Sequence, residues 1–213
     1  MGERKFILGI ADLLMVFGKP KKPKEYRISE DEFIRFACAA TRGRFFSVAG
    51  TCAISEAIIR EQRGLGVPGD ESHCGIVGYE EFGWELLPKG LDYEWTGRYF
   101  EIKRGGILGL GKKRPVTRAV RIWKLKPEFG ARLGPEDYAR AFALVKRKFR
   151  EGLPYDFLEL LTAGKLDHRE AEVCSGLVRL FIDELVRPQG KRIEEPFFMP
   201  NHLRRYCDLI AKF

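Results

Sequence analysis

The sequence predicts an α+β domain in which helices and an antiparallel sheet share one core. Helical patterns flank a central stretch of short apolar and β-branched segments, and the pattern changes at glycine and proline residues. At 213 residues, with 45% hydrophobic and 32% charged residues, the chain has the composition of a globular domain with one sizeable core.

Residues 1–27 are predicted to be an N-terminal segment, and residues 28–213 the main domain. Apolar Phe6–Phe17 is followed by the basic cluster Lys19–Lys24, whose prolines favour a linker. No small-residue cleavage site follows, so no cleavable signal peptide is indicated, and a cytoplasmic or membrane-peripheral location is expected. Phe6–Phe17 either packs on the domain or, with the lysines beside it, contacts an anionic membrane surface.

Four patterns predict helices. Ser29–Glu32 reads SEDE, a capping box, and predicts a helix that continues to about Ala40. Ala53–Gly64 has helical spacing and ends at a glycine. A further amphipathic helix is expected to begin near Pro135, and another to carry Cys174 close to its start.

Between these helices, residues 74–125 predict three to five antiparallel strands. HCGIVGY and GWELLP are separated by a turn-like EEFG and predict a hairpin, and strands are also expected in residues 94–104 and 116–126. The intervening 105–113 loop contains G-x4-G-K, but Lys113 stands where a phosphate-binding loop needs Ser or Thr. We therefore expect a hairpin loop that overhangs a cleft, and no nucleotide or other cofactor.

The cysteines favour neither a disulfide framework nor a metal site. They are five, an odd number, and widely scattered: Cys38, Cys52, Cys74, Cys174 and Cys207. No pair has the C-x2-C spacing of a zinc site, so no metal is expected, and a reducing compartment is indicated.

Cys174 and His73 are candidates for nucleophilic catalysis. A free thiol is only a few per cent thiolate at neutral pH, and a helix N-terminus or a positive neighbour is needed to activate it. His73 opens a predicted strand and could accept the thiol proton if the fold brings it close. Taken singly, an inert buried cysteine and a structural histidine are the commoner interpretations.

Two segments resemble the NlpC/P60 cysteine peptidases. CSGLVRLF, from Cys174, is similar to their nucleophile helix, and SHCGIVGYEEFGWEL, from Ser72, is similar to their histidine strand. The polar partner of that histidine lies about a dozen positions onward, which here is Glu85. Because His73 precedes Cys174, the chain resembles the circularly permuted papain-like branch, the YiiX/YaeF-like hydrolases. LPYDFLELL before the helix and MPNHLRRY after it also resemble that branch, and the similarity extends over residues 46–206.

The resemblance implies a permuted papain-like fold, with an antiparallel sheet packed against the helix that carries the cysteine. Cys174 would be the nucleophile, His73 the general base and then acid, and Glu85 the group that orients the imidazole. The Cys174 backbone N–H is a natural oxyanion donor. Further substrate-binding residues would be Ser72, Tyr155, Asp156 and Ser175; the Tyr155 ring could equally pack against the cysteine helix.

Other residues compete for these roles. His168 precedes the helix, in an expected loop, and His202 is expected to be a surface cap. Glu80, Glu81 or Glu94 would replace Glu85 if the hairpin register differed. Cys74 should face away from the His73 imidazole, because adjacent strand residues point to opposite faces.

The resulting functional hypothesis is a cysteine hydrolase, or acyltransferase, that acts through a thioacyl-enzyme on an amide, ester or thioester. The resemblance implies peptidoglycan peptide amides or lipid acyl groups as substrates. The alternative is a non-catalytic binding or assembly protein of the same fold, whose net charge of +8 contacts nucleic acid or acidic partners. No groove-reading or base-stacking motif is recognisable, so nucleic acid is the less expected partner. The sequence leaves the oligomeric state open.

Overall fold

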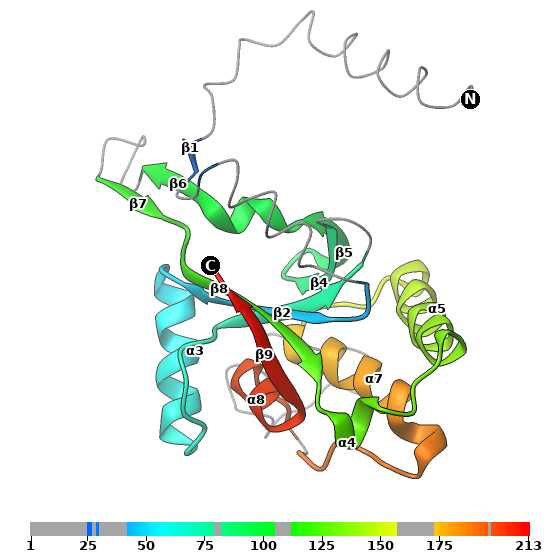
Figure 1. The fold of residues 1–213 in the computed structure, drawn as a ribbon. Helices are drawn as coiled ribbons and strands as arrows, with labels where there is room; N and C mark the ends of the chain where they lie inside the picture. The colour runs from blue at the N-terminus through cyan, green and yellow to red at the C-terminus, as the bar shows by residue number, and fades with distance from the viewer. Residues whose placement is uncertain are drawn as a thin grey trace, which may run out of the picture.

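The computed structural model describes residues 25–26, 29, 42–78, 82–104, 112–156, 173–195 and 197–213 (Figure 1). Several predictions lie outside these residues. They concern the apolar and basic N-terminal segments, the helix expected after Ser29, residues Cys38, Glu80, Glu81 and His168, and most of the 105–113 loop.

A six-stranded antiparallel sheet forms the centre of the molecule. Its strand order is β5-β4-β3-β2-β8-β9, so the chain's last strand lies at one edge. The strands in that order are β5 (Gly90–Trp95), β4 (Phe82–Leu87), β3 (His73–Val77), β2 (Phe45–Gly50), β8 (Thr117–Leu125) and β9 (Cys207–Lys212).

A smaller three-stranded sheet lies on one side of the large sheet. Its order is β1 (Glu25–Tyr26), β6 (Glu101–Arg104) and β7 (Lys113–Pro115). The 3-10 helix η1 (Thr96–Phe100) connects β5 of the large sheet to β6 of the small one.

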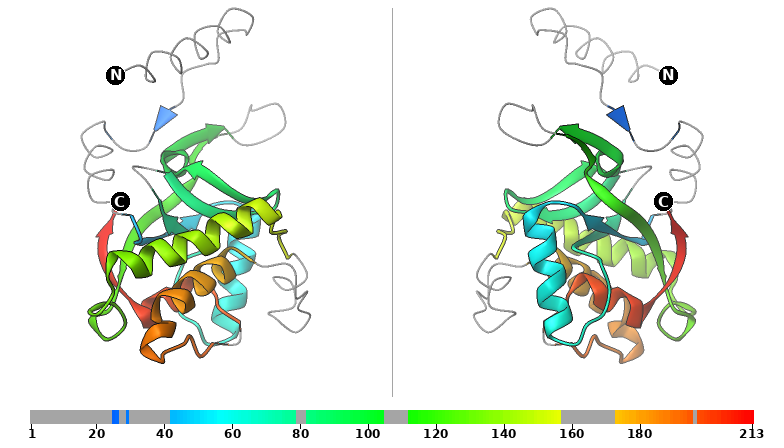
Figure 2. Two further views of the ribbon diagram at one scale, coloured as in Figure 1. Left: turned by 90° about the vertical axis from the view of Figure 1, so that its right-hand side faces the viewer. Right: turned by 90° about the vertical axis from the view of Figure 1, so that its left-hand side faces the viewer.

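The main helices lie on the other side of the large sheet (Figures 1 and 2). They are α5 (Pro135–Glu151) and α7 (Cys174–Val186), which pack together, while α3 (Ala53–Gly64) follows β2 and flanks the sheet. Short elements complete the described chain: α4 (Pro127–Gly130), η3 (Arg187–Gln189), η4 (Pro200–His202) and α8 (Leu203–Tyr206).

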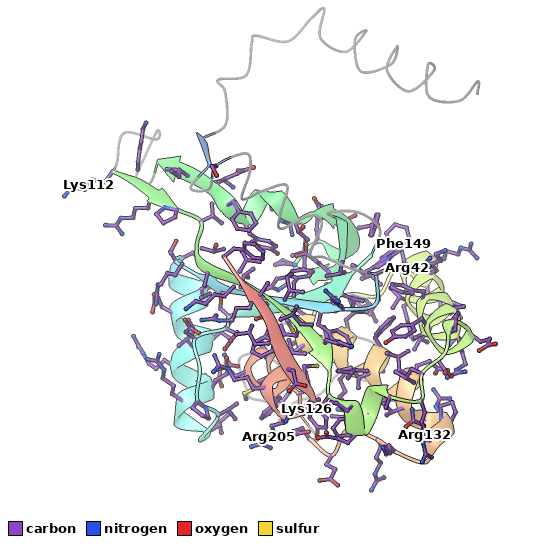
Figure 3. All side chains as sticks on the ribbon, viewed as in Figure 1. Arg42, Lys112, Lys126, Arg132, Phe149 and Arg205 are labelled. Atoms are coloured by element: carbon purple, nitrogen blue, oxygen red, sulfur yellow. The ribbon has the colours of Figure 1, made fainter. Side chains whose placement is uncertain are left out.

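Side chains lie on both sides of the large sheet (Figure 3), and each face buries its own apolar cluster. The larger cluster joins the sheet to α5 and α7 through side chains that include Phe45, Phe142 and Phe181. The smaller cluster joins the opposite face to η1 through side chains that include Phe46 and Phe100. Burial of these large side chains, worth roughly 1.5–3 kcal/mol each, holds the helices against the sheet.

Gly75 allows the central strands to pack beside the start of β3. A Cβ atom there would lie 2.5 Å from the Phe46 ring and 2.7 Å from the Trp84 carbonyl oxygen. Any side chain at this position would therefore displace either the ring or the neighbouring strand β4. The glycine two residues after His73 thus has a packing role in this fold.

The predicted α+β class is confirmed. The helices expected at 53–64, near Pro135 and at Cys174 are present, and β3 and β4 form the expected antiparallel pair. The expectation of three to five strands in residues 74–125 was too low, since the six strands β3 to β8 occur there, with β3 beginning at His73. Strands β2 and β9, which lie outside this stretch, were not foreseen. The strand expected over residues 94–104 is interrupted by η1, where the chain leaves one sheet for the other.

Among the described residues, no helix is both long and apolar enough to cross a membrane.

Candidate active site

Cys174 is the first residue of α7 and is almost completely buried. Val173 before it is extended, and no side chain caps the helix. The first N–H groups of a helix have no carbonyl partner within it and form the positive end of the helix dipole. The sulfur of Cys174 therefore lies where negative charge is stabilised.

His73 is the first residue of β3, and α7 packs directly on this strand. Its ring lies against Phe46 and Tyr99, with centroid distances of 6.4 and 6.0 Å. His73 Nε2 lies 2.8 Å from Glu85 Oε2 on β4. This leaves Nδ1 as the ring nitrogen available to the neighbouring Cys174 thiol.

Glu85 is fully buried, and its Oε2 atom is the meeting point of three donors. Besides His73, the Arg98 Nη2 atom donates to Oε2 at 2.8 Å and the Tyr99 hydroxyl donates a short hydrogen bond. Burial and the adjacent carboxylate raise the pKa of Tyr99 well above its ordinary value, which keeps the hydroxyl a donor. Arg98 supplies the positive charge that a buried carboxylate requires.

The Cys174 thiol and the His73 imidazole each stabilise the charged form of the other. Burial opposes protonation of the imidazole, but the neighbouring Cys174 sulfur and Glu85 outweigh it and raise the pKa of His73 to about 10. A hydrogen bond from Cys74, together with the positive His73, outweighs burial and holds the pKa of Cys174 well below its ordinary value. A thiolate–imidazolium pair is thus favoured at neutral pH.

Cys74 is a member of this group that the sequence did not indicate. The expected alternation holds: His73 packs with Phe46 and Tyr99 on one face, while Cys74 is buried in the cluster that joins the sheet to α7. From that face its thiol acts on the neighbouring Cys174 sulfur and lowers the pKa of Cys174. Burial and this contact raise the pKa of Cys74, so it remains an S–H donor.

A pocket opens beside Cys174. Its apolar wall consists of Ile58 from α3 and of Phe197, Met199 and Pro200 from the segment before α8. Polar side chains also line it, and these include Ser72 and Ser175, both predicted substrate-binding residues. The Cys174 sulfur therefore shares this pocket with side chains from α3 and from the segment before α8.

Two predicted site residues lie elsewhere. Tyr155 packs against the larger apolar cluster, and neither it nor the buried Asp156 lines the pocket. Of the two roles considered for Tyr155, packing is therefore the one observed. Short-range motif similarity could not separate the two roles, because the distance from Tyr155 to the pocket depends on how α5 and α7 pack.

The competing residues within the described chain have other partners. Glu94 forms ion pairs with Lys89 and Arg98, not with His73. The expectation of a surface position for His202 was wrong: it is buried, and its Nδ1 accepts a hydrogen bond from the Met199 N–H. It caps a turn in the interior, because the last strand β9 brings the preceding segment back against the domain.

Sequence reasoning missed Arg98 and Tyr99, which hold Glu85. They lie in η1, within a segment expected to be a strand, and only the helical turn places both beside β4. A buried carboxylate needs a counter-charge. This requirement was the one reason, before the structure, to expect a basic residue beside Glu85.

The arrangement can perform acyl transfer: a thiolate at a helix N-terminus, a protonated imidazole beside it and a carboxylate that fixes the ring. No group of His, Cys, Asp or Glu side chains in the described ranges is arranged to hold a metal ion. In comparisons with known proteins, the chain matches no family model and no curated protein.

Proposed function

We propose that this protein is a cysteine hydrolase that cleaves an amide, ester or thioester through a thioacyl-enzyme. The observation that carries the proposal is the convergence of Cys174, His73 and Glu85, residues separated by up to 101 positions in the chain, beside a pocket that Cys174 lines. Two activated groups and an orienting carboxylate are the minimum set for this chemistry.

In the proposed reaction the Cys174 thiolate attacks the carbonyl carbon of the substrate, and a C–S bond forms. Backbone N–H groups at the start of α7 stabilise the oxyanion, a role worth roughly 3 kcal/mol in acyl-transfer enzymes. The His73 imidazolium gives its proton to the leaving amine, alkoxide or thiolate as the bond to carbon breaks. His73 then takes a proton from water, which attacks the thioacyl carbon and regenerates Cys174.

Glu85 supports both steps by positioning His73. Its hydrogen bond to Nε2 directs Nδ1 towards the sulfur and stabilises the imidazolium. Arg98 and Tyr99 bond to the same carboxylate oxygen, so the orienting group is itself fixed.

The similarity to the permuted NlpC/P60 branch remains part of this proposal. The chain order His73, Glu85, Cys174 and the packing of the cysteine helix on the histidine strand support it. On that similarity the substrates would be peptidoglycan peptide amides or lipid acyl groups, and transfer to an acceptor other than water is the corresponding acyltransferase reaction.

The test is the pH dependence of Cys174 alkylation by iodoacetamide, with peptide mass mapping. Mapping is needed because Cys52 is exposed and also reacts. We expect rapid labelling of Cys174 well below the pKa of a free thiol, about 8.5, and slower labelling at low pH after His73→Ala. Cys174→Ala should abolish turnover of ester and amide substrates without unfolding the protein. Labelling of Cys174 that titrates like a free thiol would refute the proposal.

The second candidate is a binding or assembly protein, favoured by the net charge of +8. Salt-dependent binding of DNA or RNA by a protein whose Cys174 shows no enhanced reactivity would support this alternative.

A further inference from the structure

One carboxylate lines the pocket of Cys174 and has no partner among the described residues. Glu61 lies on α3, one turn after Ile58, and both side chains face the pocket. No ion pair or side-chain hydrogen bond to Glu61 occurs within the described part of the chain. Glu61 is also the one carboxylate among the described residues that line this pocket.

The neighbouring polar side chains of the pocket already form hydrogen bonds within the protein. Gln62 donates to the Glu71 carbonyl at 2.7 Å and accepts from the Asn201 N–H at 3.0 Å. Ser72 Oγ accepts from the Gly50 N–H at 3.0 Å. These groups hold the pocket wall together, whereas the Glu61 carboxylate contributes nothing to it.

Glutamates that are buried more deeply than Glu61 have arginine or lysine partners. Glu71 pairs with Arg204 at 2.7 Å, and Glu195 pairs with Arg205 at 2.7 Å. A chain with 38 basic and 30 acidic residues has no shortage of cations, so an unpaired carboxylate at the nucleophile's pocket is a departure from the pattern of this protein.

The surroundings of Glu61 favour a cationic ligand. Apolar side chains form much of the wall beside it, and burial raises the pKa of Glu61 above its ordinary value. A carboxylate that has lost part of its hydration gains most from a ligand that brings both a positive charge and hydrogen-bond donors. An ammonium group is the compact form of such a ligand.

We propose that Glu61 binds an ammonium group on the acyl part of the substrate, so that aminoacyl or peptidyl groups with a free amine are preferred. Glu61 is then a specificity determinant: it places the amine at one end of the pocket and the reacting carbonyl at Cys174. This inference rests on the proposed function, since Cys174 must be the reacting group.

The first experiment needs no substrate. Cys174 is modified with two methanethiosulfonates, the cationic aminoethyl and the neutral methyl reagent, and the ratio of their rate constants is measured by peptide mapping. The protein carries Cys52→Ser, because Cys52 is exposed and caps α3, and serine retains a capping oxygen. We expect Glu61→Gln to lower the cationic-to-neutral ratio about threefold to fivefold, the effect of a partly exposed charge pair.

Glu56→Gln is the matched control. Glu56 lies on the same helix, is exposed and pairs with Arg118, and it does not line the pocket. Its substitution removes the same charge from α3, and the ratio should remain at the wild-type value. An unchanged ratio in Glu61→Gln, or equal falls in both variants, overturns the inference.

Substrate pairs extend the test to catalysis. Aminoacyl thioesters are compared with their N-acetyl counterparts, which differ only in the amine. Glu61→Gln should lower kcat/KM for the free amine about threefold to fivefold and leave the acetylated substrate unchanged. If Glu61→Gln lowers kcat/KM equally for both substrates, the proposed role of Glu61 is overturned, but the proposed function is not. If the wild-type protein turns over neither substrate, and the Cys174 thiol titrates like a free thiol, the proposed function itself is overturned.

Discussion

Removal of the Cys74 thiol should raise the pKa of Cys174 while leaving the histidine and glutamate in place. Cys74 is fully buried, it lies on the face of β3 opposite to His73, and its thiol is the first cause that lowers the pKa of Cys174. A hydrogen bond to a charged group contributes about 1.5–3 kcal/mol, and an S–H group is a weak donor. We therefore take a value just below this range, about 1.4 kcal/mol, which corresponds to one pKa unit.

The assay is the rate of Cys174 alkylation against pH in Cys74→Ala, from which the midpoint of the thiol titration is read. We expect the midpoint to move upward by about one unit. Thermal stability should fall only slightly, since the substitution removes one small buried atom.

Cys207→Ala is the matched control for this experiment. Cys207 is also buried in the larger cluster, but the groups that act on its thiol are Asp208 and Lys126, not Cys174. The same loss of a sulfur atom there should leave the Cys174 midpoint unchanged. An unchanged midpoint in Cys74→Ala, or the same shift in Cys207→Ala, would refute the reasoning.

Three further predictions concern the histidine and the group that holds it. Glu85→Gln should reduce kcat about 10- to 100-fold, because the charge-assisted bond to His73 is lost; an undiminished kcat would contradict the orienting role. Tyr99→Phe should lower the free energy of unfolding by about 1–2 kcal/mol, measured in urea, and reduce turnover less than Glu85→Gln does. Turnover should be lost in acid as Cys174 is protonated below its lowered pKa, and lost near pH 10 as His73 loses its proton. A profile that rises with a single midpoint at the pKa of a free thiol, about 8.5, would contradict the ion pair.

The sequence by itself determined the helices and the central hairpin. Ala53–Gly64, the helix from Pro135 and the helix from Cys174 have spacings of apolar residues that specify helix locally. The hairpin that contains His73 and Glu85 has its own turn, but the contact between the two residues was predicted from the 12-residue offset of the family that this segment resembles. Such features depend on neighbours along the chain.

The tertiary structure decided how these elements meet. β2 joins the sheet between β3 and β8, and β9 arrives from the chain's end, pairings that no local pattern specifies. Long-range packing also gave Glu85 its partners Arg98 and Tyr99, moved Tyr155 away from the pocket and placed Cys74 against Cys174. The reason is physical: periodicity encodes which face of an element is apolar, whereas the partner of that face depends on the shape of the whole core.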